Sequence, residues 1–122
     1  MTGGNLQHAL TQTAEVATHV DLGADTRTRF ETLLHAIISD DDYTPAVTSD
    51  GEGFIVQWMA GQRYLYVEVY SDGEWALSET ADDGSITINE AGEGLPDLDR
   101  VRERITALTA HVTAVLAARD PR

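Results

Sequence analysis

The four histidines could bind a metal or transfer a proton, because imidazole is both a common metal ligand and a general base near neutral pH. They are spread over the chain, and none stands beside a second histidine or a carboxylate in a spacing that we interpret as a metal motif. Cysteine is absent, which excludes thiolate ligands and thiol nucleophiles. We therefore predict no metal site and no cofactor. The histidines are His8, His19, His35 and His111.

Carboxylates gather in four short turns, and clustered oxygen ligands are what a calcium ion requires. None of these turns has alternating ligands with a glycine at the sixth position and a glutamate at the twelfth. Acids in turns are also solvated, which does not favour the sheltered carboxylate pair of an acid–base catalyst. The turns lie at residues 40–42, 50–52, 72–74 and 82–84.

The remaining nucleophiles and glycines give no catalytic pattern. No serine lies in a nucleophile-elbow motif, and the chain has no lysine, because all eight basic residues are arginine. The segment Gly92-Glu93-Gly94 carries negative charge where a phosphate-binding loop would place its ligand. We predict no catalytic residue and no enzyme activity. A small ligand-binding protein or enzyme is kept as an alternative, which would require a concave pocket.

The formal net charge of −13 opposes binding to nucleic-acid phosphates or anionic lipid and favours a protein partner with a basic surface. Between Arg63 and Arg100 there are ten acidic residues and no basic one. No apolar run approaches the roughly 20 residues that span a bilayer, and residues 1–6 do not have the pattern of a secretion signal. We expect a cytoplasmic protein that binds neither membranes nor nucleic acid directly.

Apolar residues repeat at helical spacing in three segments. The first, within residues 1–23, is rich in threonine and predicts a weakly packed N-terminal helical segment. The second spans residues 25–39, and the third is a long C-terminal helix over about residues 97–118. A chain of 122 residues is long enough for one core but not for two, so we predict a single domain, 1–122, with a disordered tail at 119–122.

Between the second and third helices apolar and polar residues alternate, which is typical of antiparallel strands. Gly61-Gln62 predicts a two-residue turn, so residue 60 should face residue 63. The next loop has two or three residues, and we prefer a three-residue loop ending at Gly73 because it buries more apolar area. Ile86 and Ile88 are expected to point into the core, and residues 46–49 are a candidate for a short edge strand. The predicted meander of three to four strands covers about residues 54–60, 63–71, 74–80 and 85–90.

The predicted fold class is α+β: two N-terminal helices, an antiparallel meander, and a C-terminal helix packed on one face of the sheet. The other face then carries tyrosines and a methionine, which are enriched in protein contacts. Two arrangements remain open, in which this face is exposed for recognition or is covered by the N-terminal helix. The predicted partner-binding residues, with carboxylates that steer a basic protein, are Gln57, Met59, Tyr64, Tyr66, Tyr70, Asp82, Asp83, Glu90 and Glu93.

The central hairpins follow the pattern G-x-x-x-x-W from Gly53, G-x-R-x-L-x-V-E-V from Gly61, and D-G-E from Asp72. This pattern resembles a core found in short uncharacterised bacterial proteins, and it covers about the central quarter of the chain. Their function is not established, so the resemblance implies no activity. The expected helices around an antiparallel sheet are also similar to small acidic secretion chaperones, but those proteins insert a helix within the sheet and this sequence does not.

These features favour a small acidic protein-binding module without catalytic activity. The leading hypothesis is an immunity protein, an antitoxin or a phage-type inhibitor that neutralises a basic or nucleic-acid-binding target. The alternative is an acidic chaperone or adaptor, similar to a secretion chaperone, that uses the tyrosines or forms a homodimer through its heptad-like last helix.

Overall fold

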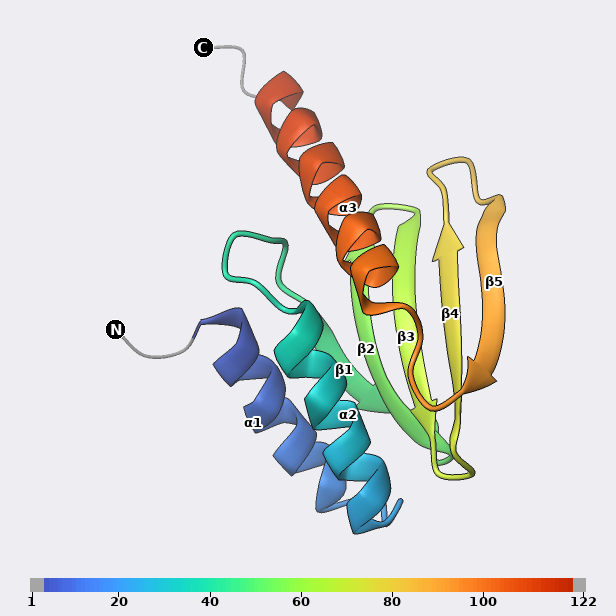
Figure 1. Ribbon diagram of the computed structural model, residues 1–122. Coiled ribbons are helices and arrows are strands. Elements are labelled where there is room, and N and C mark those ends of the chain that lie inside the picture. The colour runs from blue at the N-terminus through green and yellow to red at the C-terminus, as the bar shows by residue number, and fades with distance from the viewer. Residues whose placement is uncertain (1–3, 120–122) are drawn as a thin grey trace.

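The chain folds as two N-terminal helices, a five-stranded antiparallel sheet and a long C-terminal helix (Figure 1). The computed structural model describes residues 4–119. The α+β class is therefore confirmed, with one strand more than the predicted maximum. The elements are α1 (Asn5–Ala17), α2 (Ala24–Ile37), β1 (Ala46–Ser49), β2 (Gly53–Ala60), β3 (Arg63–Tyr70), β4 (Glu74–Thr80), β5 (Ile86–Glu93) and α3 (Leu98–Arg119).

The strands form a simple meander in the order β1-β2-β3-β4-β5, and both predicted hairpin registers are confirmed. Ala60 faces Arg63 across the two-residue turn, where Gly61 has the positive φ of 63° that a glycine tolerates. Val69 faces Trp75 across the three-residue loop, which ends at Gly73 with φ of 96°. As a result, Trp58 and Trp75 lie on the same side of the sheet.

The two outer strands differ from the prediction in extent and in register. The candidate edge segment does form β1, and β5 continues past the predicted end at residue 90 to Glu93. A bulge at Glu79/Thr80 adds one residue to β5, so that Ile88 faces Glu79 while Ile86 faces Thr80. The expectation that both isoleucines enter the core is wrong for Ile86, because the bulge turns it to the other face and leaves it 66% exposed.

All three helices pack on one face of the sheet and enclose the core (Figure 1). Phe30 of α2 stacks on Phe54 of β2 with ring centroids 5.2 Å apart, and Trp58 donates from Nε1 to the carbonyl of Tyr43 at 2.9 Å. Asp97 caps α3 by accepting from the backbone N–H of Asp99 and Arg100, at 3.0 and 3.3 Å. Figure 1 shows the C-terminal half of α3 extending beyond the strands.

α1, which the sequence predicts to be weakly packed, lies against α2 and β1. Its Ala9 and Thr13 are fully buried, and Oε1 of Gln12 accepts the backbone N–H of Val47 at 3.0 Å. This contact covers the edge formed by β1, whereas no helix of residues 4–119 lies along the edge formed by β5 (Figure 1). The predicted disordered tail falls, beyond Arg119, outside the described residues.

No helix within the described range is both long and apolar enough to cross a membrane.

Candidate functional site

One face of the sheet carries no helix, because α1, α2 and α3 all contact the sheet from the opposite side. We call this surface the open face. The arrangement in which α1 covers the tyrosines is thereby excluded for the residues that the structure describes. The side chains that strand alternation directs to the open face are those of Ala46, Thr48, Ile55, Gln57, Met59, Tyr64, Tyr66, Glu68, Tyr70, Glu74, Ala76, Ser78, Thr80, Ile86, Asn89, Ala91 and Glu93.

The structure brings five of the predicted partner-binding residues together on the open face. Gln57 lies opposite Tyr66, and Met59 lies opposite Tyr64. The Tyr64 hydroxyl donates to Oε1 of Gln57 at 2.6 Å, and the Tyr64 and Tyr66 rings are 5.4 Å apart. Tyr70 lies at the far end of β3, and all three tyrosines are half-buried.

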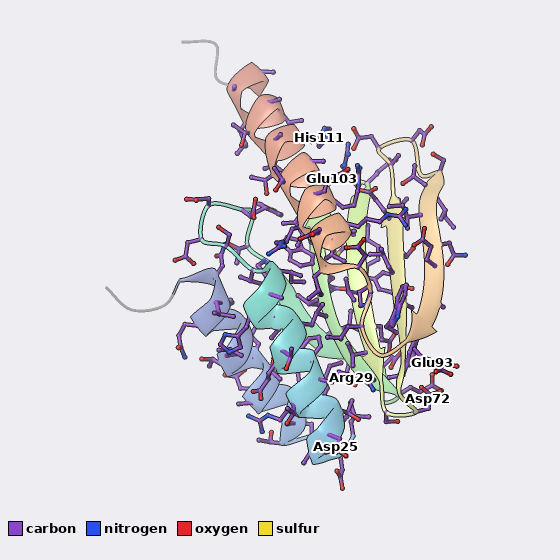
Figure 2. All side chains as sticks on the ribbon, in the orientation of Figure 1. Asp25, Arg29, Asp72, Glu93, Glu103 and His111 are labelled. Carbon is purple, nitrogen blue, oxygen red and sulfur yellow. The ribbon has the colours of Figure 1, made fainter. Side chains whose placement is uncertain are left out.

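The centre of the open face is almost free of charge, although charged residues make up 24% of the chain. Its large apolar side chains include Met59, which is 56% exposed, and Ile86, which is 66% exposed. Glu74 and Glu93 face each other at one end of the strands, where Figure 2 shows Glu93 and Asp72 close to the β3–β4 loop. An uncharged, aromatic surface with charge only at its margin has the composition of a protein contact.

The four predicted steering carboxylates are not brought together. Glu90 faces Leu77 on the helix-covered side, where it accepts from Nη1 of Arg100 at 2.6 Å. Asp82 and Asp83 lie in the β4–β5 turn, and Glu93 lies at the opposite end of β5. The four predicted steering carboxylates are thus divided between two ends and two faces of the sheet, because side chains of β5 alternate between the faces along the strand.

Asp83 and Asp82 have local partners as well. Hydrogen bonds from the hydroxyl and backbone N–H of Ser85, at 2.6 and 2.9 Å, lower the pKa of Asp83, which therefore caps its own turn. Asp82 lies 3.2 Å from Nε2 of His111, a residue of α3 that is distant in sequence. No serine or threonine hydroxyl within the described residues is hydrogen-bonded to His111, so the pair lacks the nucleophile of a catalytic triad.

Alternation predicts that Glu68 lies on the face of the tyrosines, but the sequence does not predict its burial, and Glu68 is not among the predicted partner-binding residues. It projects to the open face between Tyr66 and Tyr70, yet it is only 3% exposed. Its carboxyl fills the space left by the missing side chain of Gly53, because a Cβ atom there would lie 3.0 Å from Oε2 of Glu68. A glutamate between two tyrosines, on a strand whose neighbour begins with glycine, is the sequence signal for this arrangement.

Asp50, in the β1–β2 loop, is the charged neighbour of Glu68. Burial of the Glu68 carboxyl and its proximity to Asp50 raise the pKa of Glu68 to about 7. Burial acts to raise the pKa of Asp50 as well, but hydrogen bonds from the N–H of Glu52 at 2.9 Å, from the Glu68 carboxyl and from the N–H of Gly53 at 3.2 Å together leave this pKa lowered. Below about pH 7 the two carboxyls therefore hold one proton between them, mainly on Glu68.

A second buried glutamate, Glu79, lies on the helix-covered face. Arg104 of α3 donates to it from Nε at 2.9 Å and from Nη2 at 3.1 Å, which makes a bidentate ion pair. Arg63 and Arg100 line the same depression, and Arg100 pairs with Glu90 of β5, so two arginines of α3 bind the sheet here. This cluster holds the fold together and is separate from the open face.

The histidines and the grooves of the surface are the remaining candidates for a metal or ligand site. No three histidine or acidic side chains within the described chain are arranged to hold a metal ion. His8 is exposed on α1, His19 between α1 and α2, and His35 on α2. They do not form a cluster. A groove of about 380 Å³ lies between α3 and the β2–β3 turn, and its lining includes Val112, Val115 and Leu116.

Comparison with protein-family models, with curated proteins and with solved structures finds no match to this chain.

Proposed function

We propose that this protein is a non-catalytic protein-binding module of the cytoplasm that binds its partner through the open face. The observation that supports the proposal is the one-sided arrangement of the helices. A sheet with one uncovered face usually presents polar side chains there. Here the uncovered face has polar side chains but also presents three tyrosines, Met59 and Ile86, with almost no charge at its centre.

The physical chemistry of this face suits a protein partner. Tyrosine offers a large amphipathic area at a low cost in side-chain entropy, and its hydroxyl remains able to hydrogen-bond. Tyr64 and Tyr66 already contact each other, so part of their order exists before binding. We infer that these two residues form the centre of the contact.

The partner we propose is basic, because the chain carries a net charge of −13. An inhibitor, immunity protein or antitoxin acting on a nucleic-acid-binding protein would have this charge. Asp82 and Asp83 at one end of the open face, and Glu93 at the other, would steer the approach while the uncharged centre is buried.

Site-specific photo-cross-linking tests the proposal in the organism that encodes the protein. A photoreactive phenylalanine analogue replaces Met59 or Ile86 on the open face, and replaces the exposed His8 on α1 as the matched control. We expect the same cross-linked product from both open-face positions and none from His8. Tyr66→Ala should abolish the product. Equal products from all three positions, or a product from His8 alone, would refute the proposed surface.

Salt dependence tests the basic nature of the partner separately. The yield of the open-face product should fall steeply between roughly 50 and 500 mM salt, because screening shortens the Debye length from over 10 Å to a few ångströms. Replacing Asp82, Asp83 and Glu93 by their amides should produce the same loss at low salt. A salt-independent yield would leave the binding face intact but exclude steering by charge.

A second candidate function is an acidic chaperone or adaptor that acts as a homodimer through α3. The observation favouring it is an apolar strip on the part of α3 that extends beyond the strands, where Leu116 is 59% exposed. Light scattering should then give twice the chain mass of 13.3 kDa, and Leu116→Glu should return it to a single copy. A monomeric mass for the unmodified chain would remove this candidate.

A further inference from the structure

Glu68 is the single ionisable carboxyl within the central part of the open face. At 3% exposure it is removed from water, and its Oε2 has no hydrogen-bond partner within residues 4–119. Leaving a buried carboxylate oxygen without a donor is costly. The centre of the open face therefore contains one buried carboxyl that has no cation beside it among residues 4–119, and the Tyr70 phenol is the neighbour that favours its ionised form.

The surroundings of Glu68 supply acids and phenols but no cation. From β3, Tyr66 and Tyr70 flank it and Tyr64 lies further along the strand; the β1–β2 loop adds Asp50 and Glu52. Its direct neighbours on β2 and β4, Ile55 and Ala76, are neutral.

Arg29 of α2 is the arginine that reaches this end of the sheet, as Figure 2 shows. It approaches from the helix-covered side, where Nη2 donates to the carbonyls of Tyr70 and Glu74. It forms no ion pair with Glu68. No cation among residues 4–119 therefore pairs with Glu68, which leaves this position available to a positive charge from a partner.

We propose that Glu68, which lies between Tyr66 and Tyr70 on β3, and Asp50 of the β1–β2 loop form a recognition site for one arginine side chain of the protein that binds the open face. This inference rests on the proposed function. A guanidinium group fits the site better than an ammonium, because its planar fork donates to two carboxylates at once and its face stacks on aromatic rings.

Binding at this site exchanges one cation for one proton. In the free protein, burial and Asp50 hold the pKa of Glu68 at about 7, so the pair keeps a proton below that pH. The incoming guanidinium favours the ionised carboxylate, and Glu68 releases its proton to solvent. No covalent bond forms. Affinity for an arginine side chain should therefore rise as pH increases toward 7 and level off above it.

Carbon-13 NMR of the glutamate carboxyls in the full chain tests this exchange. The probe is acetyl-arginine methylamide hydrochloride at about 50 mM, compared with sodium chloride at equal ionic strength and with urea as a neutral analogue. We expect the arginine compound to lower the titration midpoint of Glu68 by half a unit or more. Urea should not, and the resonance of the exposed Glu15 should respond equally to both salts.

Two variants separate recognition from a structural role. Glu68→Gln removes the titrating resonance and so identifies it. Asp50→Asn keeps a buried carboxyl at Glu68 but removes one of the two acceptors, and should at least halve the shift caused by the arginine compound. If the midpoint is the same in the arginine compound and in sodium chloride, the pair only anchors the loop and the inference is overturned.

The outcome can be told apart from failure of the proposed function. Photo-cross-links at Met59 that persist together with an arginine-insensitive midpoint would reject the arginine site alone. If the protein that carries the photoreactive residue at position 59, with no other substitution, gives no cross-link, binding through the open face is rejected, whatever the NMR result. Cross-links that weaken five-fold or more in Glu68→Gln, in a variant that unfolds at the same temperature or higher, would support both.

Discussion

Glu79 and Glu68 are two buried glutamates on adjacent strands of one sheet, and they differ in what surrounds them. They are 2% and 3% exposed, respectively. On the helix-covered face Glu79 receives both donors of the Arg104 fork, and the Thr87 hydroxyl donates to its backbone carbonyl at 3.1 Å. On the open face Glu68 has another acid and a phenol as its neighbours.

The comparison shows that the two faces satisfy a buried carboxyl by different means. A carboxyl away from water is either ionised beside a cation or neutralised by a proton. On the helix-covered face, Arg104 of α3 supplies the cation for Glu79. On the open face a proton neutralises Glu68, and its ionised form would need a cation from a partner.

The largest expected effect on the free energy of unfolding comes from breaking the ion pair between Glu79 and Arg104. Arg104→Met leaves Glu79 buried without its cation, and should lower the free energy of unfolding by about 3–5 kcal/mol. Urea denaturation measures the change. Arg27→Met is the control, because Arg27 and Glu31 form an exposed pair at 3.5 Å, which should contribute less than about 0.5 kcal/mol. Similar losses in both variants would contradict the distinction between paired and surface charges.

The next effect concerns the space in which Glu68 lies. A methyl group added by Gly53→Ala would be 2.5 Å from the carbonyl oxygen of Val69 and 3.0 Å from the Glu68 carboxyl. Such overpacking costs about 1–3 kcal/mol. The displaced carboxyl should also titrate at lower pH, since its pKa returns toward the ordinary value. If stability and the NMR titration midpoint are both unchanged, the absence of a side chain at residue 53 does not determine where the Glu68 carboxyl lies.

The third effect depends on pH. The folded pKa of Glu68, about 7, is above the ordinary 4.5, so its contribution to stability is fully present below pH 4.5 and is lost as pH rises to about 7. The glutamine of Glu68→Gln cannot ionise, so this variant does not lose stability in this pH range. Each pKa unit corresponds to about 1.4 kcal/mol, and solvent screening reduces the total to about 1–2 kcal/mol. Thermal unfolding at pH 5 and pH 8 should therefore show the variant gaining on the unmodified protein at the higher pH. A parallel pH profile for the two proteins would contradict the shared proton.

The smallest expected effect on stability is on the exposed apolar side chains. Met59→Ser and Ile86→Ser should each change the free energy of unfolding by less than about 0.5 kcal/mol, because neither residue belongs to the core. The neighbouring core substitution Leu65→Ala should cost about 2–5 kcal/mol. A loss above about 2 kcal/mol in either serine variant would mean that the open face is needed for folding rather than for binding.

Much of the fold follows from local pattern. Alternation alone places Trp58 and Trp75 on one side and the tyrosines on the other, because turn length fixes which residues face each other. The bulge at Glu79/Thr80 could not be found this way, since one extra residue shifts the alternation without leaving a mark in the composition. That shift is the reason why Ile86 is on the open face.

The candidate site was predictable only in part, for a related reason. The tyrosines follow from the register of β2 and β3, but the burial of Glu68 depends on a loop, a glycine and a second acid that the sequence does not visibly connect. The ion pair between Glu79 and Arg104 likewise depends on where α3 crosses the sheet. Long-range placement of this kind is not encoded in any single periodic segment.

The unequal protection of the two outer strands limits how copies of this chain can join. Fibres grow when each added copy presents a fresh unpaired strand to the next, which requires two free edges. Here Gln12 occupies the backbone N–H of Val47, and α1 lies against that side. Joining through β5 would consume the remaining free edge of each copy, so such growth stops at a symmetric pair.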